Sequence, residues 1–261
     1  MILTIDIGNS SISAGAFGSD GRLAFAAALE TVPHASRDRC AMDLLNLFRL
    51  YGAEIRSVEG TILSCVVPPL EACMAGAVDF LTGRKPLMVG PGIKTGLNIR
   101  SDLHNQLGSD IVASSVAALA QYPSPVIVID LGTATTFSLL RRGVYEGCAI
   151  LPGVRLGLEA LSERAAELPQ ISMELPPSPL GRNTIDAMRS GVLYGNAGMV
   201  DSMIERFEAA CGEPAKAVVA TGGNAPLILP HCRREIVYEP ALLLNGLYLL
   251  YRKNTEKHRK L

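Results

Sequence analysis

Short apolar segments rich in Val, Ile and Leu alternate along this chain with longer segments in which apolar residues recur every three or four positions. Continuous apolar runs of four to eight residues are typical of buried strands, and the longer period is typical of helices that cover a sheet. Near the N-terminus the pattern predicts three successive strands joined by tight polar turns, at residues 2–7, 12–17 and 22–28. Helices at 37–51, 68–81 and 108–121 and strands at 60–67 and 86–89 are then predicted.

The same order of elements begins again after Pro123-Ser124-Pro125. Strands are predicted at 126–129, 135–140, 144–151, 215–220 and 235–238, and helices at 156–167, 184–211 and 240–252. Glycines at 191, 195 and 198 weaken the prediction of one continuous helix at 184–211, because each costs about 1 kcal/mol relative to Ala. The repetition predicts an α/β protein with two tandem domains, residues 1–121 and 122–261, and a cleft between them.

Each predicted domain has a strand that ends in an acidic, glycine-containing, hydroxyl-rich turn: IDIGNSSIS at 5–13 and IDLGTATT at 129–136. A carboxylate at the end of a buried strand is costly unless it is paired or used. Glycine lets the backbone approach a ligand closely, and the neighbouring amides and hydroxyls can bind phosphate oxygens. A third turn, Thr221-Gly222-Gly223, follows another strand. Two such turns indicate a nucleoside triphosphate site, although each acid alone also fits simple turn stabilisation.

Composition narrows the class of protein without naming a reaction. The 261 residues are 48% hydrophobic and carry a formal net charge of −1, which gives no reason to expect binding to nucleic acid or to a membrane surface. We expect no membrane span, because no apolar stretch approaches about 18 residues. The six cysteines form no CxxC pair and do not cluster with histidine, so a structural metal site is not expected. A strand at residue 2 leaves no room for a signal peptide, and we expect a cytoplasmic protein.

Several motifs, in their order along the chain, resemble those of type III pantothenate kinases. They are IDIGNSSIS at 5–13, LSCVVP at 63–68, GSD at 108–110, IDLGTATT at 129–136, ILPGV at 150–154, ATGGNA at 220–225 and PALLLNGL at 240–247. The resemblance implies the fold of the actin, sugar-kinase and heat-shock ATPases, with two ribonuclease-H-like domains and a homodimer. It also implies transfer of the ATP γ-phosphate to the terminal hydroxyl of pantothenate, the first step towards coenzyme A, with Mg²⁺ and a monovalent cation such as K⁺ or NH₄⁺.

The resemblance also implies roles for particular residues. The first phosphate loop would consist of Asp6, Ile7, Gly8, Asn9, Ser10, Ser11, Ile12 and Ser13, with Asp6 near the Mg²⁺. Thr133, Gly222 and Gly223 would contact ATP, and Asp130 would bind the monovalent cation. Asp110 would be the base that accepts the proton of the pantothenate hydroxyl, and the substrate contacts would come from Gly108, Ser109, Asp110, Ile111 and Thr184, the last across a dimer interface. Asp110 and Thr184 also suit ordinary positions at helix N-termini.

One motif departs from the family pattern beside the predicted base. The family has Arg after the Asp of its Gly-x-Asp motif, and this chain has Ile111; Ser101 and His104 stand where a Tyr and a Pro are expected. Isoleucine lacks the fixed charge and paired donors with which Arg binds an anionic substrate. We expect Arg100, Lys94 or a basic residue of a partner subunit to replace it. Two other functions stay open: a kinase of the same fold with another hydroxyl acceptor, and a catalytically silent ligand-binding paralogue.

Overall fold

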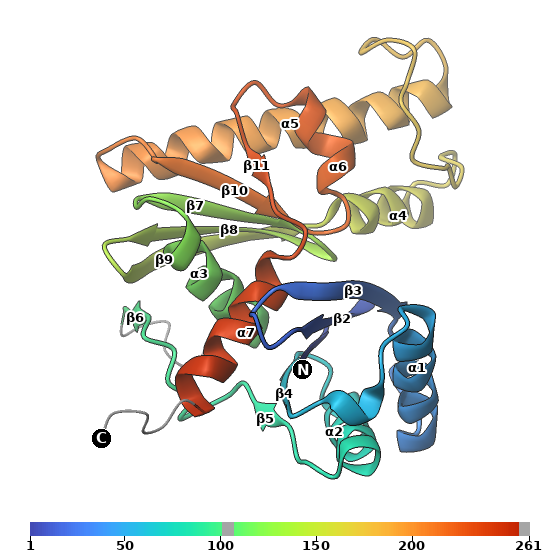
Figure 1. The fold of residues 1–261 in the computed structure, drawn as a ribbon. Helices are drawn as coiled ribbons and strands as arrows, with labels where there is room; N and C mark the ends of the chain where they lie inside the picture. The colour runs from blue at the N-terminus through green and yellow to red at the C-terminus, as the bar shows by residue number, and fades with distance from the viewer. Residues whose placement is uncertain (101–106, 256–261) are drawn as a thin grey trace. The chain divides into compact units, whose positions relative to one another are not determined.

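The computed structural model describes residues 1–100 and 107–255, and the chain divides into two compact units (Figure 1). Among the described residues, the first unit contains 1–97, 107–120 and 241–255. The second contains residues 98–100 and 121–240. The long segment of the second unit begins one residue before the predicted second domain, and residues 98–100 also belong to this unit. The prediction differs at the C-terminal end, because it assigned all of 122–261 to the second domain.

The sheet of the first unit contains the predicted three-strand meander. Strands β1 (Ile2–Ile7), β2 (Ser11–Phe17) and β3 (Leu23–Glu30) pair antiparallel, and β4 (Gly60–Cys65) and β5 (Leu87–Met88) extend the sheet in parallel beyond β1. The strand order is β3-β2-β1-β4-β5.

Helices cover both faces of this sheet. On one face lie α1 (Arg37–Leu50), whose N-cap Ser36 accepts a hydrogen bond from the Arg39 amide, and α2 (Pro68–Thr82). Their buried Leu44 and Met74 belong to one core with Leu3 and Ile5 of β1. The other face is covered by α3 (Ser109–Gln121) and α7 (Leu242–Thr255); a short 3₁₀ turn, η1, spans Ile55–Ser57.

Helix α7 belongs to the first unit because its apolar residues pack there. Leu247 and Leu250 share a buried cluster with Ile62 of β4 and Ala113 of α3. A Cβ atom at Gly246 would collide with the backbone of Ala113, so glycine permits this close approach of α7 and α3. The amphipathic pattern of α7 was predicted correctly, but its partner strand lies more than 170 residues earlier in the chain.

The second unit repeats the first sheet strand for strand. Its strands are β7 (Val126–Leu131), β8 (Ala134–Arg141), β9 (Val144–Pro152), β10 (Ala217–Thr221) and β11 (Val237–Tyr238), in the order β9-β8-β7-β10-β11. The first three pair antiparallel and the last two in parallel, as in the first unit. A short additional strand, β6 (Asn98–Ile99), pairs with β9. The predicted duplication of one α/β plan is confirmed.

One core links the helices of the second unit to its sheet. These helices are α4 (Val154–Arg164), α5 (Thr184–Cys211) and α6 (Ala225–Ile228), followed by the 3₁₀ turn η3 (Leu229–His231). Helix α5 runs unbroken through its three glycines, and α4 begins two residues before its predicted start.

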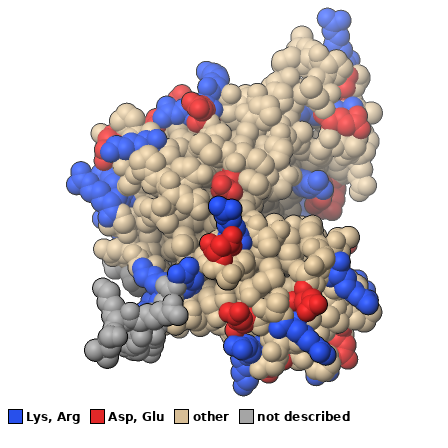
Figure 2. Space-filling view, in the orientation of Figure 1, with Lys and Arg blue, Asp and Glu red and all other residues tan. Residues whose placement is uncertain are grey.

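The surface carries both signs of charge. On the face shown in Figure 2, basic and acidic side chains are interspersed, without a large area of one sign. Among the described residues, no helix is long and apolar enough to cross a bilayer.

Candidate functional site

The first predicted phosphate turn places Asp6 near the end of β1. Parallel pairing of β1 with β4 sets Asp6 opposite Ser64, and the Ser64 hydroxyl donates a hydrogen bond of 2.6 Å to Asp6 Oδ1. Both side chains are buried, Asp6 at 7% exposure and Ser64 at 0%. The carboxylate at this strand end is therefore paired with a donor, as its burial requires.

A second hydroxyl extends this pair to helix α3. Ser109 Oγ lies 2.7 Å from Ser64 Oγ. A serine hydroxyl has one hydrogen, and that of Ser64 is given to Asp6, so Ser109 is the donor in this contact. Ser109 is the first residue of α3 and precedes Asp110. Through Ser64, the structure thus joins the first phosphate turn to the GSD motif by two hydrogen bonds, which span 58 and 45 residues.

Asp110 lies in the first turn of α3 and is partly buried. Its Oδ1 accepts a hydrogen bond of 2.8 Å from the Ile111 amide. A Cβ atom at Gly108 would collide with this Oδ1, so the glycine of the GSD motif makes room for the carboxylate. The Ile111 side chain is also partly exposed, beside the predicted base.

Two hydrogen bonds to backbone carbonyl groups close the first turn. The Gly8 amide donates to Ser11 O at 3.0 Å, and the Thr31 hydroxyl donates to Gly8 O at 2.7 Å. Two residues predicted to contact ATP, Ile7 and Ile12, have their side chains in the core, so only their backbone groups can meet a ligand. The exposed residues of the turn, which can offer side chains, are Asn9, Ser10 and Ser11.

In the second unit, two glycine-containing turns pack against each other. The Asn224 amide donates to Leu131 O at 3.1 Å, and its side-chain amide donates to Gly132 O at 3.2 Å. The Gly153 amide donates to Thr133 O at 3.1 Å, which holds the ILPGV segment against the same turn. Thr133 itself is exposed.

Gly222 and Gly223 differ in their surroundings. Gly222 has φ +93°, and a Cβ there would lie 2.5 Å from Asp130 Oδ1 and 2.6 Å from the carbonyl carbon of Leu131. A Cβ at Gly223 would meet nothing within 4 Å. Gly222 is therefore required by the fold, whereas Gly223 presents open backbone. The predicted residues Asp130, Thr133, Gly222 and Gly223 all lie around these turns.

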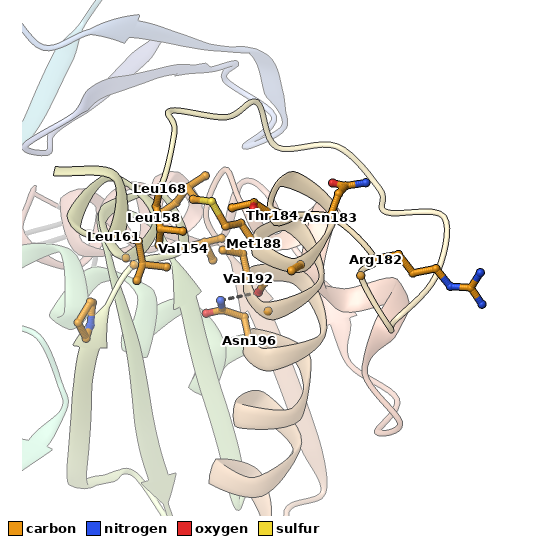
Figure 3. Close-up of a pocket in the computed structure, with 16 residues that line it drawn as sticks. Val154, Leu158, Leu161, Leu168, Arg182, Asn183, Thr184, Met188, Val192 and Asn196 are labelled. Atoms are coloured by element: carbon orange, nitrogen blue, oxygen red, sulfur yellow. Dashed lines mark hydrogen bonds between the residues drawn. The ribbon is translucent and has the colours of Figure 1, made fainter. Parts of the chain in front are cut away.

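Thr184 lines a cavity of about 790 Å³ in the second unit, together with Pro152 and Gly153 of the ILPGV segment (Figure 3). Leu158 and Leu161 of α4 face Met188 of α5 in this cavity, while Arg182 points away from it (Figure 3). The N-cap of α5 is Asn183, whose side chain accepts from the Asp186 amide at 2.9 Å. The Thr184 hydroxyl is therefore not required as the helix cap.

One of the residues expected to replace the missing Arg, Arg100, is paired within the second unit. Arg100 donates to Glu146 Oε2 at 2.9 Å, and Arg141 donates to Glu146 Oε1 at 3.2 Å, all within the second unit. The Arg100 hydrogen bond is the main reason that the pKa of Glu146 is lowered. Ser101 and His104 lie outside the described residues.

Sequence reasoning missed Ser64. The LSCVVP motif contains it and resembles the family, but the motif alone gives no reason to choose this hydroxyl. Its partner, Asp6, is 58 residues away in sequence. Only the parallel pairing of β1 with β4 shows that the two side chains meet.

Comparison with known proteins agrees with the motifs. The family model described as type III pantothenate kinase matches residues 2–206. The chain is 40% identical over 258 residues to the type III pantothenate kinase of Geobacillus thermodenitrificans, an alignment that covers 98% of this chain and 99% of the relative. This chain belongs to the type III pantothenate kinase family. The relative from Geobacillus kaustophilus is equally similar, 40% identical over the same share of both chains.

Solved structures of low sequence identity share the fold. The activator of 2-hydroxyisocaproyl-CoA dehydratase from Clostridium difficile, solved with bound ADPNP, has a TM-score of 0.58 at 12% identity and covers 96% of this chain and 93% of its own. The ROK family glucokinase from Streptomyces griseus, solved with glucose and AMPPNP, has a TM-score of 0.53 at 16% identity, with coverage of 96% and 99%. The predicted fold of the actin and sugar-kinase ATPases is confirmed.

Proposed function

We propose that this protein transfers the γ-phosphate of ATP to the terminal hydroxyl of pantothenate, giving 4′-phosphopantothenate, the first step towards coenzyme A. The observation that carries the proposal is the hydrogen-bond chain from buried Asp6 and Ser64 to partly buried Ser109, which connects the phosphate-turn acid to the segment that holds Asp110. Phosphoryl transfer depends mainly on positioning and on stabilising charge, so a fixed link between these two segments suits it.

Asp6 is the residue that we assign to Mg²⁺. Mg²⁺ in kinases is held by one or two carboxylates, substrate phosphates and several waters, rather than by a protein cage. The described residues contain no group of three or more His, Cys, Asp or Glu that could hold a metal, so the protein would supply few ligands. Asp6 Oδ1 accepts a hydrogen bond from the Ser64 hydroxyl, which fixes the carboxylate in place. Bound Mg²⁺ would neutralise charge on the transferring phosphate.

The remaining nucleotide contacts would come from the second unit. We assign Asp130 to a monovalent cation, K⁺ or NH₄⁺, and Thr133 to the phosphates of ATP. The open backbone at Gly223 supports the assignment of this turn to the adenosine side.

We assign Asp110 as the base that orients the acceptor hydroxyl and accepts its proton as the new O–P bond forms. Its position in the first turn of α3 supports this role, since Gly108 leaves the carboxylate its space. Ile111 cannot bind the pantothenate carboxylate, and Arg100 is paired with Glu146. Lys94 and a basic residue of a partner subunit are therefore the remaining candidates for binding the anionic end of the substrate.

We also propose a homodimer in the cytoplasm, in which Thr184 contacts substrate bound to the partner. Large apolar side chains exposed on α4, α5 and the intervening segment support an interface there; they are Leu156, Leu161, Leu175, Leu180 and Ile185, 43–74% exposed. The exposed Gly191, Gly195 and Gly198 lie at i, i+4 and i+7 on α5, where a second helix can approach closely.

The test is ADP release with Mg²⁺, K⁺ and a panel of hydroxyl acceptors. Turnover restricted to pantothenate supports the proposal, turnover with another acceptor supports a different kinase, and no turnover supports a silent paralogue. Asp110→Asn should abolish turnover and preserve ATP binding. Asp38→Asn is the matched control, because Asp38 occupies the first turn of α1 as Asp110 occupies that of α3. Equal rates for these two variants would show that Asp110 is only a helix-end charge.

A further inference from the structure

We propose that Ser64 is a positioning residue, which fixes the Asp6 carboxylate for the metal–nucleotide complex and ties it through Ser109 to the helix that carries Asp110. The inference rests on the proposed function, in which Asp6 contacts Mg²⁺ and Asp110 is the base. It adds a residue to which the motifs assign no role. Its physical content is a directed chain of hydrogen bonds inside the first unit.

The direction of the chain fixes the carboxylate. Ionised Asp6 only accepts, so the Ser64 hydrogen points to Oδ1, and Ser64 in turn accepts from Ser109. The other oxygen lies on the side of the phosphate turn, because a Cβ at Gly8 would be 4.0 Å from Asp6 Oδ2. The serine therefore holds one oxygen and sets the direction of the second. Groups that hydrogen-bond a metal-binding carboxylate in this way commonly affect metal affinity or activity about 10- to 100-fold.

The sheet places Ser64 where it cannot turn away. Asp6 and Ser64 are in-register neighbours on parallel strands, and both lie on the face covered by α3 and α7, as Ile62 does. Ser64 has 0% exposure, so in the folded protein its hydroxyl is held among protein atoms beside Asp6. A deletion of this hydroxyl would leave a buried charged acceptor with one donor fewer.

The second unit repeats the same pair. Parallel pairing of β10 with β7 sets Thr221 opposite Asp130, the register that sets Ser64 opposite Asp6 in the first unit. Thr221 is likewise buried, at 4% exposure. Both phosphate-turn acids thus have a buried hydroxyl residue at the equivalent position of the adjacent strand. This recurrence at equivalent positions favours a role at the acids over incidental packing of a small polar residue.

The same sheet offers a hydroxyl that is purely structural. Thr4 is at 0% exposure on β1, two residues before Asp6, and its hydroxyl donates to Gly15 O at 3.1 Å. Thr4→Val removes this hydroxyl and keeps the shape of the side chain. It is therefore the matched control for Ser64→Ala.

The experiment measures the Kd of AMPPNP in Mn²⁺ and in EDTA, together with kcat, KM and the thermal midpoint. For Ser64→Ala we expect Mn²⁺–AMPPNP to bind about 10-fold more weakly or worse, with metal-free AMPPNP changed less than about twofold, and kcat lowered about 10- to 100-fold. Thr4→Val should lower the thermal midpoint without moving the ratio of the two Kd values. A Ser64→Ala ratio equal to that of Thr4→Val would overturn the proposal.

Ser109→Ala tests the second link, and it stands in if Ser64→Ala does not fold. It should preserve Mn²⁺–AMPPNP affinity while lowering kcat, because it cuts the connection from Ser64 to α3; loss of the substrate contact predicted for Ser109 would instead raise the KM of pantothenate. An unchanged kcat would overturn that connection. If wild-type protein showed no metal-dependent nucleotide binding and no ADP release, the proposed function would fail and this inference with it. Wild-type activity with an unaffected Ser64→Ala would remove the inference alone.

Discussion

Alanine substitutions at the neighbouring Gly222 and Gly223 should separate a backbone requirement from a ligand contact. Gly222 has φ +93°, in the left-handed region, and its added Cβ would lie within 2.7 Å of Asp130 Oδ1 and of the Leu131 carbonyl carbon and nitrogen. Gly223 has open space at the same point. The two glycines are adjacent in sequence, but only at Gly222 would an added Cβ collide with other atoms.

The expected cost at Gly222 has two parts. A non-glycine residue in the left-handed conformation costs roughly 1–2 kcal/mol. Displacing backbone atoms to relieve overpacking costs about 1–3 kcal/mol more. A total near 3 kcal/mol would lower the thermal midpoint by about 6–12 °C for a domain of this size. Gly223→Ala, which meets no atom, should change the free energy of unfolding by no more than about 0.5 kcal/mol.

Differential scanning calorimetry and AMPPNP titration measure the two effects. Gly222→Ala should lose both stability and nucleotide affinity, because its methyl group pushes on the Asp130 carboxylate. Gly223→Ala should retain the wild-type midpoint and bind AMPPNP more weakly, since the methyl group occupies space assigned to adenosine. A wild-type midpoint for Gly222→Ala would refute the steric argument. Unchanged AMPPNP affinity for Gly223→Ala would refute the assignment of this glycine to ATP.

Two further predictions concern charge and assembly. The pKa of Glu146 is lowered, chiefly by its hydrogen bond from Arg100. Its ion pairs therefore stabilise the fold fully above the ordinary glutamate pKa of about 4.3. This stabilisation is lost as the pH falls through the lowered pKa. In urea unfolding, wild type should lose stability on acidification more steeply than Glu146→Gln, and parallel pH profiles would contradict this. Gly195→Ala adds a methyl group where the chain has no atom within 4 Å, so we expect helix α5 to become more stable by up to about 1 kcal/mol. The same methyl group would hinder the close approach of a partner helix, so we expect sedimentation velocity to show a weaker dimer. An intact dimer with a higher thermal midpoint would place the interface elsewhere.

The alternation of apolar segments was sufficient to predict the meander that opens each sheet, because its strands are sequential neighbours, but it did not predict β6. The register follows from short turns, such as Gly18-Ser19-Asp20-Gly21 between β2 and β3. The C-terminal helix shows the limit of this reasoning. Its pattern predicted an amphipathic helix, and chain order assigned it to the second domain, yet Leu247 packs with Ile62. Apolar periodicity shows that a helix has a buried face but does not identify the surface that covers it.

The same limit applies to the site. Turn chemistry identified Asp6 and Asp130, since a glycine and hydroxyl residues follow each acid along the chain. The structure explains why glycine stands at 108, because a Cβ there would collide with the Asp110 carboxylate. Contacts made across parallel strands leave no such local pattern. Ser64 meets Asp6 because β1 and β4 pair, and nothing near either residue in sequence records that pairing.

Duplication does, however, carry information about these non-local contacts. If two units share strand order and register, a contact in one predicts the equivalent contact in the other, as Asp6–Ser64 predicts Asp130–Thr221. Each acid then has one buried hydroxyl residue on the adjacent parallel strand and one hydroxyl residue, Ser13 or Thr136, on the antiparallel side. In the first unit, the Ser64 hydroxyl holds the Asp6 carboxylate in a fixed direction through a hydrogen bond of 2.6 Å. We therefore expect Ser64 and Thr221, which are buried opposite the two acids, to tolerate substitution poorly.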